Sequence, residues 1–135
     1  MIQIKKDSSK PIYEQVVFGV KESILHGALL PGDKIPSIRE MANQLLLNPN
    51  TISKAYGILE DQDIIETVQG KGTFVKQTEP VLRNELDVRM LKKKLTELVI
   101  EAFYIKVGKE EMIQWIEDAV EQFGGPNHDT DSEES

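Results

Sequence analysis

The amino-acid sequence predicts a mainly α-helical fold with a small β-wing, and two observations support this class. Between residues 11 and 62, apolar residues recur every three to four positions in three short segments, which is the period of helices that pack on one face. Residues 64–75 instead read as two short strands joined by Gly70-Lys71-Gly72. Short helices followed by a hairpin predict a winged helix-turn-helix, the arrangement that presents a helix end and a loop tip to DNA.

The first helix is expected to begin at Pro11, because proline at the first helical position gives up no needed hydrogen bond. Gly27 is the predicted cap at its end, and Leu30–Asp33 forms a turn before a very short strand at residues 34–35. The predicted apolar stripe of this helix comprises Ile12, Val16, Val17, Val20, Ile24 and Leu25.

The second helix is expected to start with a capping box. Ser37 can accept a hydrogen bond from the backbone N–H of Glu40, and the Glu40 carboxylate can reach back to the N–H of Ser37. Met41, Ala42 and Leu45 then face the core. Ser37 and Glu40 therefore have a structural role, whatever else Ser37 does.

The third helix follows a turn at Leu46-Leu47, with Asn48 as the N-cap and Pro49 as the first helical residue. Its buried face is predicted to consist of Ile52, Ala55, Tyr56 and Leu59. The opposite face begins with short polar residues and a lysine, and a helix start also directs backbone N–H groups and a partial positive charge outward.

These residue types suit the reading of a DNA major groove. Asn50 can bond adenine bidentately or bond a phosphate, Thr51 and Ser53 can reach bases or backbone, and Lys54 is long enough for phosphate. The glycines beside Lys71 allow the hairpin tip to approach a sugar–phosphate wall, and Lys71 supplies the charge.

Each of these features also has a plainer explanation. Residues 48–51 can be only a helix start, residues 70–72 an ordinary hairpin turn, and Arg39 a solvated surface residue. The order and spacing of all of them together favour the functional interpretation, since the plainer one must explain each separately.

The net charge of −7 is unusual for a DNA-binding chain, but its distribution is uneven. Residues 1–78 hold nine basic and nine acidic residues, whereas residues 79–135 hold seven basic and fourteen acidic ones. Charges beyond about 8–10 Å are screened at physiological salt, so a separate acidic module weakens phosphate attraction little. Because residues 1–78 carry no net charge, we expect a modest DNA affinity for each protomer. Two protomers acting together would therefore be needed for tight binding.

Several functional classes are disfavoured by composition. The chain has no cysteine, and His26 and His128 are far apart without a partner motif, so neither a metal nor another cofactor is expected. No apolar stretch reaches the roughly 18 residues of a membrane span, and neither end resembles a signal peptide. We expect a cytoplasmic protein that does not engage membranes.

The segment from Pro11 to Val75 resembles the N-terminal domain of the GntR family of bacterial transcription regulators. The matching motifs are Pro11-Ile12-Tyr13, Gly27–Asp33, Pro36–Glu40, Asn50-Thr51, Lys54-Ala55-Tyr56, Leu59-Glu60 and Gly70–Val75. The resemblance implies a winged helix that binds a pseudo-palindromic operator in double-stranded DNA as a homodimer. The DNA contacts it implies are Ser37, Arg39, Asn48, Asn50, Thr51, Ser53, Lys54, Gly70 and Lys71. One departure is Asp63, where the family usually has glycine in a left-handed conformation that Asp tolerates better than most residues.

The second half predicts two amphipathic helices, one over residues 81–106 and one over residues 109–123, with Gly108 as the break. Two helices bury little apolar surface alone, so a second copy of the chain is the expected partner. This short C-terminus resembles that of the YtrA-type branch of the family. The expected interface residues are Leu91, Leu95, Leu98, Val99, Ala102, Ile105, Met112, Ile116 and Val120.

The predicted organisation is therefore a DNA-binding domain at 1–78, a dimerisation domain at 79–123 and a disordered acidic tail at 124–135. About 45 helical residues are too few for a metabolite pocket within one protomer, and no effector can be named. Tyr104 and Trp115 are the aromatic candidates for a cleft between protomers, although packing within the interface is the favoured explanation for both.

Three function classes follow. The leading one is a sequence-specific DNA-binding regulator that acts as a repressor. The second is a winged helix that docks protein rather than DNA, which the neutral charge of residues 1–78 keeps open. The third is an enzyme, and the chain offers no nucleophile–base pair, metal cluster or phosphate loop for one.

Overall fold

The computed structural model describes residues 2–77 and 84–123, and the chain divides into two compact units, residues 1–79 and 80–135. Five helices and a three-stranded antiparallel sheet lie in the described residues, which confirms the predicted fold class. The predicted acidic tail, residues 124–135, lies outside them. Within the described part, no helix is both long and apolar enough to span a bilayer.

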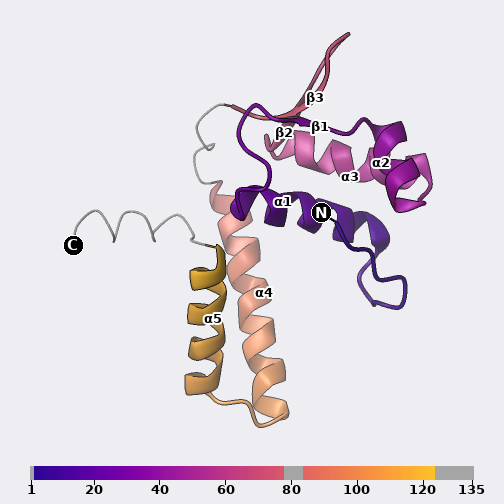
Figure 1. Cartoon of the computed structure of the whole chain (residues 1–135). Coiled ribbons are helices and arrows are strands. Elements are labelled where there is room, and N and C mark those ends of the chain that lie inside the picture. Colours follow the sequence, from indigo (N-terminus) through magenta and orange to yellow (C-terminus); the bar gives the residue numbers. More distant parts are fainter. Residues whose placement is uncertain (1, 78–83, 124–135) are drawn as a thin grey trace. The chain divides into compact units, whose positions relative to one another are not determined.

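The first unit contains α1 (Ile12–Leu25), α2 (Ile38–Leu45) and α3 (Pro49–Asp61), and α3 packs against both of the other helices (Figure 1). Apolar side chains from the three helices and the sheet form one buried core. Burial of such side chains is the main term that stabilises the unit. The core consists of Val16, Val17, Val20, Leu29, Ile35, Met41, Ala42, Ile52, Ala55, Tyr56, Leu59, Ile65 and Val75.

The end of α1 differs from the prediction. Leu25 was expected in the apolar stripe, but its side chain is 55% exposed, and its neighbour Ile24 is the residue that packs against the core. The helix ends at Leu25 with His26 as its C-cap, so the predicted cap Gly27 lies one residue further on, with a positive φ of 81°. A glycine at this position closes the helix with no steric penalty for a left-handed backbone.

The predicted caps of α2 and α3 are confirmed. Ser37 and Glu40 form both hydrogen bonds of the capping box, and Asn48 caps α3 with Pro49 as the first residue. Between the helices, Leu46 adopts a left-handed φ of 56°, and the N–H of Leu47 donates to the carbonyl of Ala42. This tight turn places the start of α3 on the surface.

The sheet consists of β1 (Lys34–Ile35), β2 (Ile65–Val68) and β3 (Gly72–Val75) in the order β1-β3-β2. Because β3 is central, it pairs Ile35 with Thr73 on one side and Val68 with Gly72 on the other. β2 and β3 project beyond the helices as a two-stranded ribbon, which is the predicted wing (Figure 1).

Asp63 has the left-handed backbone predicted for it, with a φ of 57°. Its carboxylate accepts a hydrogen bond from the ammonium group of Lys76 at 3.1 Å. A glycine could adopt the same backbone but not this ion pair, which offers a reason for aspartate here.

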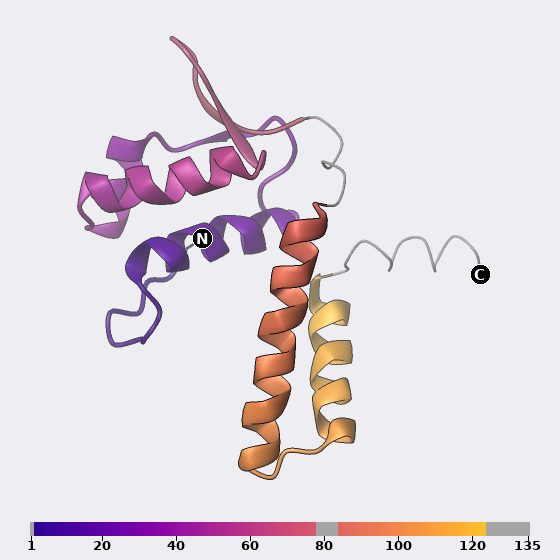
Figure 2. The same ribbon diagram turned by 180° about the vertical axis from the view of Figure 1, so that it is seen from behind.

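The second unit contains α4 (Glu85–Tyr104) and α5 (Lys109–Phe123), which run side by side in opposite directions (Figure 2). α4 is shorter than the predicted 81–106: Asn84 caps its start with hydrogen bonds to the N–H groups of Leu86 and Asp87. At the other end, Lys106 has the positive φ of 68° that stops the helix, a role we had assigned to Gly108. Ile105 is consequently the C-cap rather than part of the helical stripe, and its side chain is 73% exposed.

Candidate DNA-binding surface

The exposed stripe of α3 is the clearest functional feature of the first unit. The side chains of Ile52, Ala55, Tyr56 and Leu59 are buried in the core. Asn50, Ser53 and Lys54 are exposed on the opposite side, as is Gly57 one turn further on. Because these positions follow the helical repeat, packing of the apolar face obliges the polar face to point into solvent.

The start of α3 is held by Asn48, whose side-chain oxygen accepts from the backbone N–H of Asn50 at 2.8 Å. The N–H of Thr51 donates to the Asn48 carbonyl at 3.0 Å, and Pro49 has no N–H to offer. The expectation that free backbone N–H groups at this helix start meet phosphate is therefore wrong for these residues. The side chains of Asn50 and Thr51 make no hydrogen bond with any described residue, so their polar atoms remain available for contacts with a ligand.

A shallow depression of about 400 Å³ brings three predicted contact residues together. Asn50, Thr51 and Lys54 of α3 line it with Ile12 and Tyr13 of α1. The ammonium nitrogen of Lys54 lies 4.0 Å from the centroid of the Tyr13 ring. Tyr13 was absent from the predicted site, since only the packing of α1 on α3 brings it there, and its place in the Pro11-Ile12-Tyr13 motif was the only signal.

Ser37 and Arg39 lie at the start of α2, outside that depression. The Ser37 hydroxyl accepts from the N–H of Glu40 at 3.1 Å, and its own proton remains available for a phosphate oxygen. The backbone N–H of Ser37 donates to the Glu40 carboxylate at 3.0 Å, and the hydrogen bonds from Ser37 hold the pKa of that carboxyl below its ordinary value. Arg39 is exposed beside this box.

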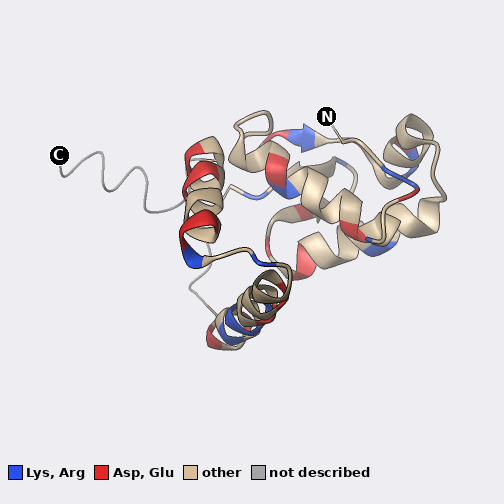
Figure 3. Ribbon diagram, turned by 90° about the horizontal axis from the view of Figure 1, so that it is seen from below, with Lys and Arg blue, Asp and Glu red and all other residues tan. Residues whose placement is uncertain are grey.

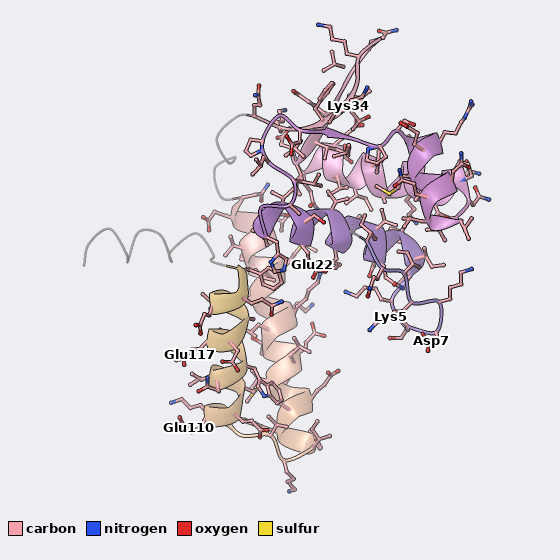
Figure 4. The ribbon with its side chains drawn as sticks, in the orientation of Figure 1. Lys5, Asp7, Glu22, Lys34, Glu110 and Glu117 are labelled. Atoms are coloured by element: carbon pink, nitrogen blue, oxygen red, sulfur yellow. The ribbon has the colours of Figure 1, made fainter. Side chains whose placement is uncertain are left out.

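The wing tip is a tight turn in which the N–H of Lys71 donates to the carbonyl of Val68 at 2.9 Å. Gly70 sits at the third turn position with a φ of 79°, which side chains rarely adopt. Gly72 is constrained twice, because its φ is 126° and a Cβ there would lie 2.7 Å from the Cε atom of Lys34. The turn thus leaves Lys71 exposed at the tip. Lys34, from β1, extends its side chain to Gly72 (Figure 4).

Charge is distributed differently in the two helices of the second unit (Figure 3). α5 carries five acidic residues and one lysine, whereas α4 mixes the two signs. The predicted DNA contacts on α2, α3 and the wing include Arg39, Lys54 and Lys71 and no acidic residue. The acidic excess of the chain thus does not fall on the contact residues themselves.

The second unit exposes most of its apolar side chains. Ala102 is the only buried residue of α4 and α5, with 8% of its surface exposed. It belongs to the predicted interface but is already covered within the protomer. An apolar groove of about 790 Å³ lies between the two helices. Its lining includes Leu95, Leu98, Val99, Met112 and Ile116 from the predicted interface, together with Trp115. Exposed apolar surface of this kind marks an interaction site.

The first unit has three helices, a capped third helix that starts with polar residues, and a β-ribbon with a glycine turn at its tip. These features define a winged helix-turn-helix protein of the DNA-binding class. Comparison with known proteins is more specific. Residues 12–75 match the model of the bacterial regulatory proteins of the gntR family. Together with the relatives that align over most of the chain, this match shows that the chain belongs to that family.

Three relatives illustrate the similarity. The chain is 43% identical to the transcriptional repressor YtrA of Bacillus subtilis over 96% of its length and 100% of that protein. The crystal structure of a transcriptional antiterminator from Listeria monocytogenes EGD-e is 40% identical, with a TM-score of 0.85 over 93% of this chain and 94% of that one. The DNA-binding domain of AraR in complex with operator ORX1 is 36% identical, with a TM-score of 0.50 over 56% of this chain and 94% of that one.

These similarities bear on two of the predictions. The likeness to YtrA extends through α4 and α5, which supports the predicted YtrA-type branch. Family membership and an operator-bound neighbour favour a DNA-binding transcription regulator over the alternative of a protein-docking winged helix.

Proposed function

We propose that this chain is a cytoplasmic transcriptional repressor without enzymatic activity that binds a pseudo-palindromic DNA operator as a homodimer. The observation that carries the proposal is the exposed polar stripe at the start of α3, backed by a fully buried apolar face. A helix presented in this way fits the major groove, where base edges carry distinct patterns of donors and acceptors. Repression is proposed because the full-length relative YtrA is a repressor.

The protein–DNA contacts divide by chemistry. In the proposed complex, Asn50, Thr51 and Ser53 reach base edges or backbone, while Arg39, Lys54 and Lys71 supply charge for phosphate; the exposure of Asn50, Ser53, Arg39, Lys54 and Lys71 supports this division. The proposed contact set is Ser37, Arg39, Asn48, Asn50, Thr51, Ser53, Lys54, Gly70 and Lys71.

Homodimerisation is supported by the exposed apolar residues of α4 and α5. A symmetric dimer buries the same groove on both copies. It also lets the two DNA-binding domains bind half-sites about 34–36 Å apart, one turn of the duplex. Two heads also compensate for the neutral charge of residues 1–78. The proposed interface comprises Leu91, Leu95, Leu98, Val99, Ala102, Ile105, Met112, Ile116 and Val120.

Selection of bound duplexes from a random pool by the full chain tests this function. We expect enrichment of an inverted repeat. On the selected duplex, Arg39→Ala should weaken binding by about five- to 150-fold per half-site, which corresponds to the loss of one DNA contact in each half-site.

Arg89→Ala is the matched control, because Arg89 is an exposed arginine of α4 outside the proposed contacts. It should bind as the unaltered chain does. Failure to enrich any sequence, or equal losses for the two arginine variants, would contradict the proposal.

A further inference from the structure

We propose that Tyr13 is a positioning residue of the DNA-binding surface, which holds the Lys54 ammonium group over the depression at the start of α3 so that it binds one operator phosphate. The inference rests on the proposed function and adds a residue of α1 to it. Its basis is the 4.0 Å distance between the Lys54 nitrogen and the Tyr13 ring centroid.

The depression has the chemistry of a phosphate site. Lys54, Thr51 and Asn50 all line it, and the side chain of each carries a hydrogen-bond donor. The side chains of Asn50 and Thr51 form no hydrogen bond with another described residue, so the donors of both are available to a ligand. The α1 residues that line it, Ile12 and Tyr13, carry no charge themselves, and the Tyr13 hydroxyl donates to the Glu14 carboxylate at 3.5 Å.

The Tyr13 ring is better suited than a carboxylate to holding Lys54 for a phosphate. A carboxylate would hold Lys54 equally well but would cancel much of the charge that a phosphate must meet. An aromatic face attracts the ammonium group through its quadrupole and leaves the net charge intact. No described carboxylate forms an ion pair with Lys54.

Holding the side chain also reduces the entropy that binding costs. Lysine has four rotatable bonds, and a free lysine must lose that freedom when it contacts DNA. Half-buried Tyr13 restricts Lys54 before DNA arrives, because α1 packs directly on α3. Because Lys54 loses less conformational entropy on binding, the same contacts with DNA give a higher affinity.

A double-mutant cycle tests the inference with the duplex selected from the random pool as probe. Tyr13→Phe keeps the ring and should bind within twofold of the unaltered chain. Tyr13→Leu should weaken binding by about two- to fivefold per half-site, or roughly four- to 25-fold for a dimer. Lys54→Met should weaken binding further and lower the salt dependence by about one counterion per half-site.

The decisive measurement is Tyr13→Leu in the Lys54→Met background, where it should have no further effect on DNA affinity. An equal loss in both backgrounds means that Tyr13 acts only by supporting the fold, and overturns the inference. So does a loss from Tyr13→Phe as large as that from Tyr13→Leu. If Lys54→Met binds unchanged, the inference fails while the proposed function stands on sequence preference; if the unaltered chain prefers no duplex, the proposed function itself fails.

Discussion

The hydroxyl of Tyr56 donates a hydrogen bond to the carbonyl oxygen of Pro36 at 2.6 Å. Tyr56 lies in the buried face of α3 and is 2% exposed, whereas Pro36 precedes α2. The bond ties α3 to the segment that carries Ser37 and Arg39. Burial, and next the nearby Glu40 carboxylate, raise the pKa of the phenol, so it stays a neutral donor.

Tyr56→Phe should destabilise the protein by about 1–3 kcal/mol, because it leaves the Pro36 carbonyl without its buried partner. Urea unfolding measures this difference. Tyr104→Phe is the control, since Tyr104 is 85% exposed, and its loss of a hydroxyl should leave the unfolding free energy unchanged. Equal stability of all three proteins would show that the Tyr56 bond contributes nothing.

Glu40→Gln should remove part of the pH dependence of stability. The hydrogen bonds from Ser37 lower the pKa of Glu40 below its ordinary value of 4.5. A carboxyl with a lowered pKa in the folded state stabilises that state above its unfolded pKa, and the effect is lost as the pH falls through the folded pKa. The stability advantage over the Gln variant should therefore be largest near neutral pH and shrink below 4.5.

Urea titrations of both proteins at neutral pH and at about pH 3.5 measure this change. The comparison isolates Glu40, because every other acidic residue is shared. A difference that is the same at both pH values would contradict the assigned cause.

Two substitutions at Asp63 separate the stability cost of its left-handed backbone from the contribution of its exposed ion pair with Lys76. Asp63→Ala loses the ion pair to Lys76 and places a less tolerant residue at a φ of 57°, which should cost about 1–2 kcal/mol. Asp63→Gly loses the same ion pair but relieves the strain, so its unfolding free energy should stay within about 0.5 kcal/mol of the original. Alanine and glycine variants of equal stability in thermal unfolding would mean that the left-handed backbone carries no cost.

Leu98→Glu should convert the homodimer to a monomer. Leu98 lines the apolar groove and is 59% exposed in the protomer, so a charge there would be buried without a partner on association. Light scattering coupled to gel filtration measures the mass. Ile100→Glu is the matched control: Ile100 is 53% exposed on the same helix but does not line the groove, and the dimer should persist. A dimer of Leu98→Glu would rule out this groove as the interface.

The sequence alone was sufficient for features that depend on neighbouring residues. The capping box at Ser37 and Glu40, the Asn48 cap and the glycine wing tip follow from spacings of two to four residues, and the structure confirms them. The buried stripe of α3 also follows from a local repeat, which in turn dictates the exposed polar face.

Tertiary packing determined what such spacings do not encode. Tyr13 meets Lys54, and Tyr56 reaches Pro36, only because α1 and the segment before α2 pack on α3. The same packing leaves Leu25 in solvent although its spacing fits the stripe. Contacts between residues distant in the chain depend on which helix faces meet, and that choice minimises exposed apolar surface over the whole unit rather than within any one segment.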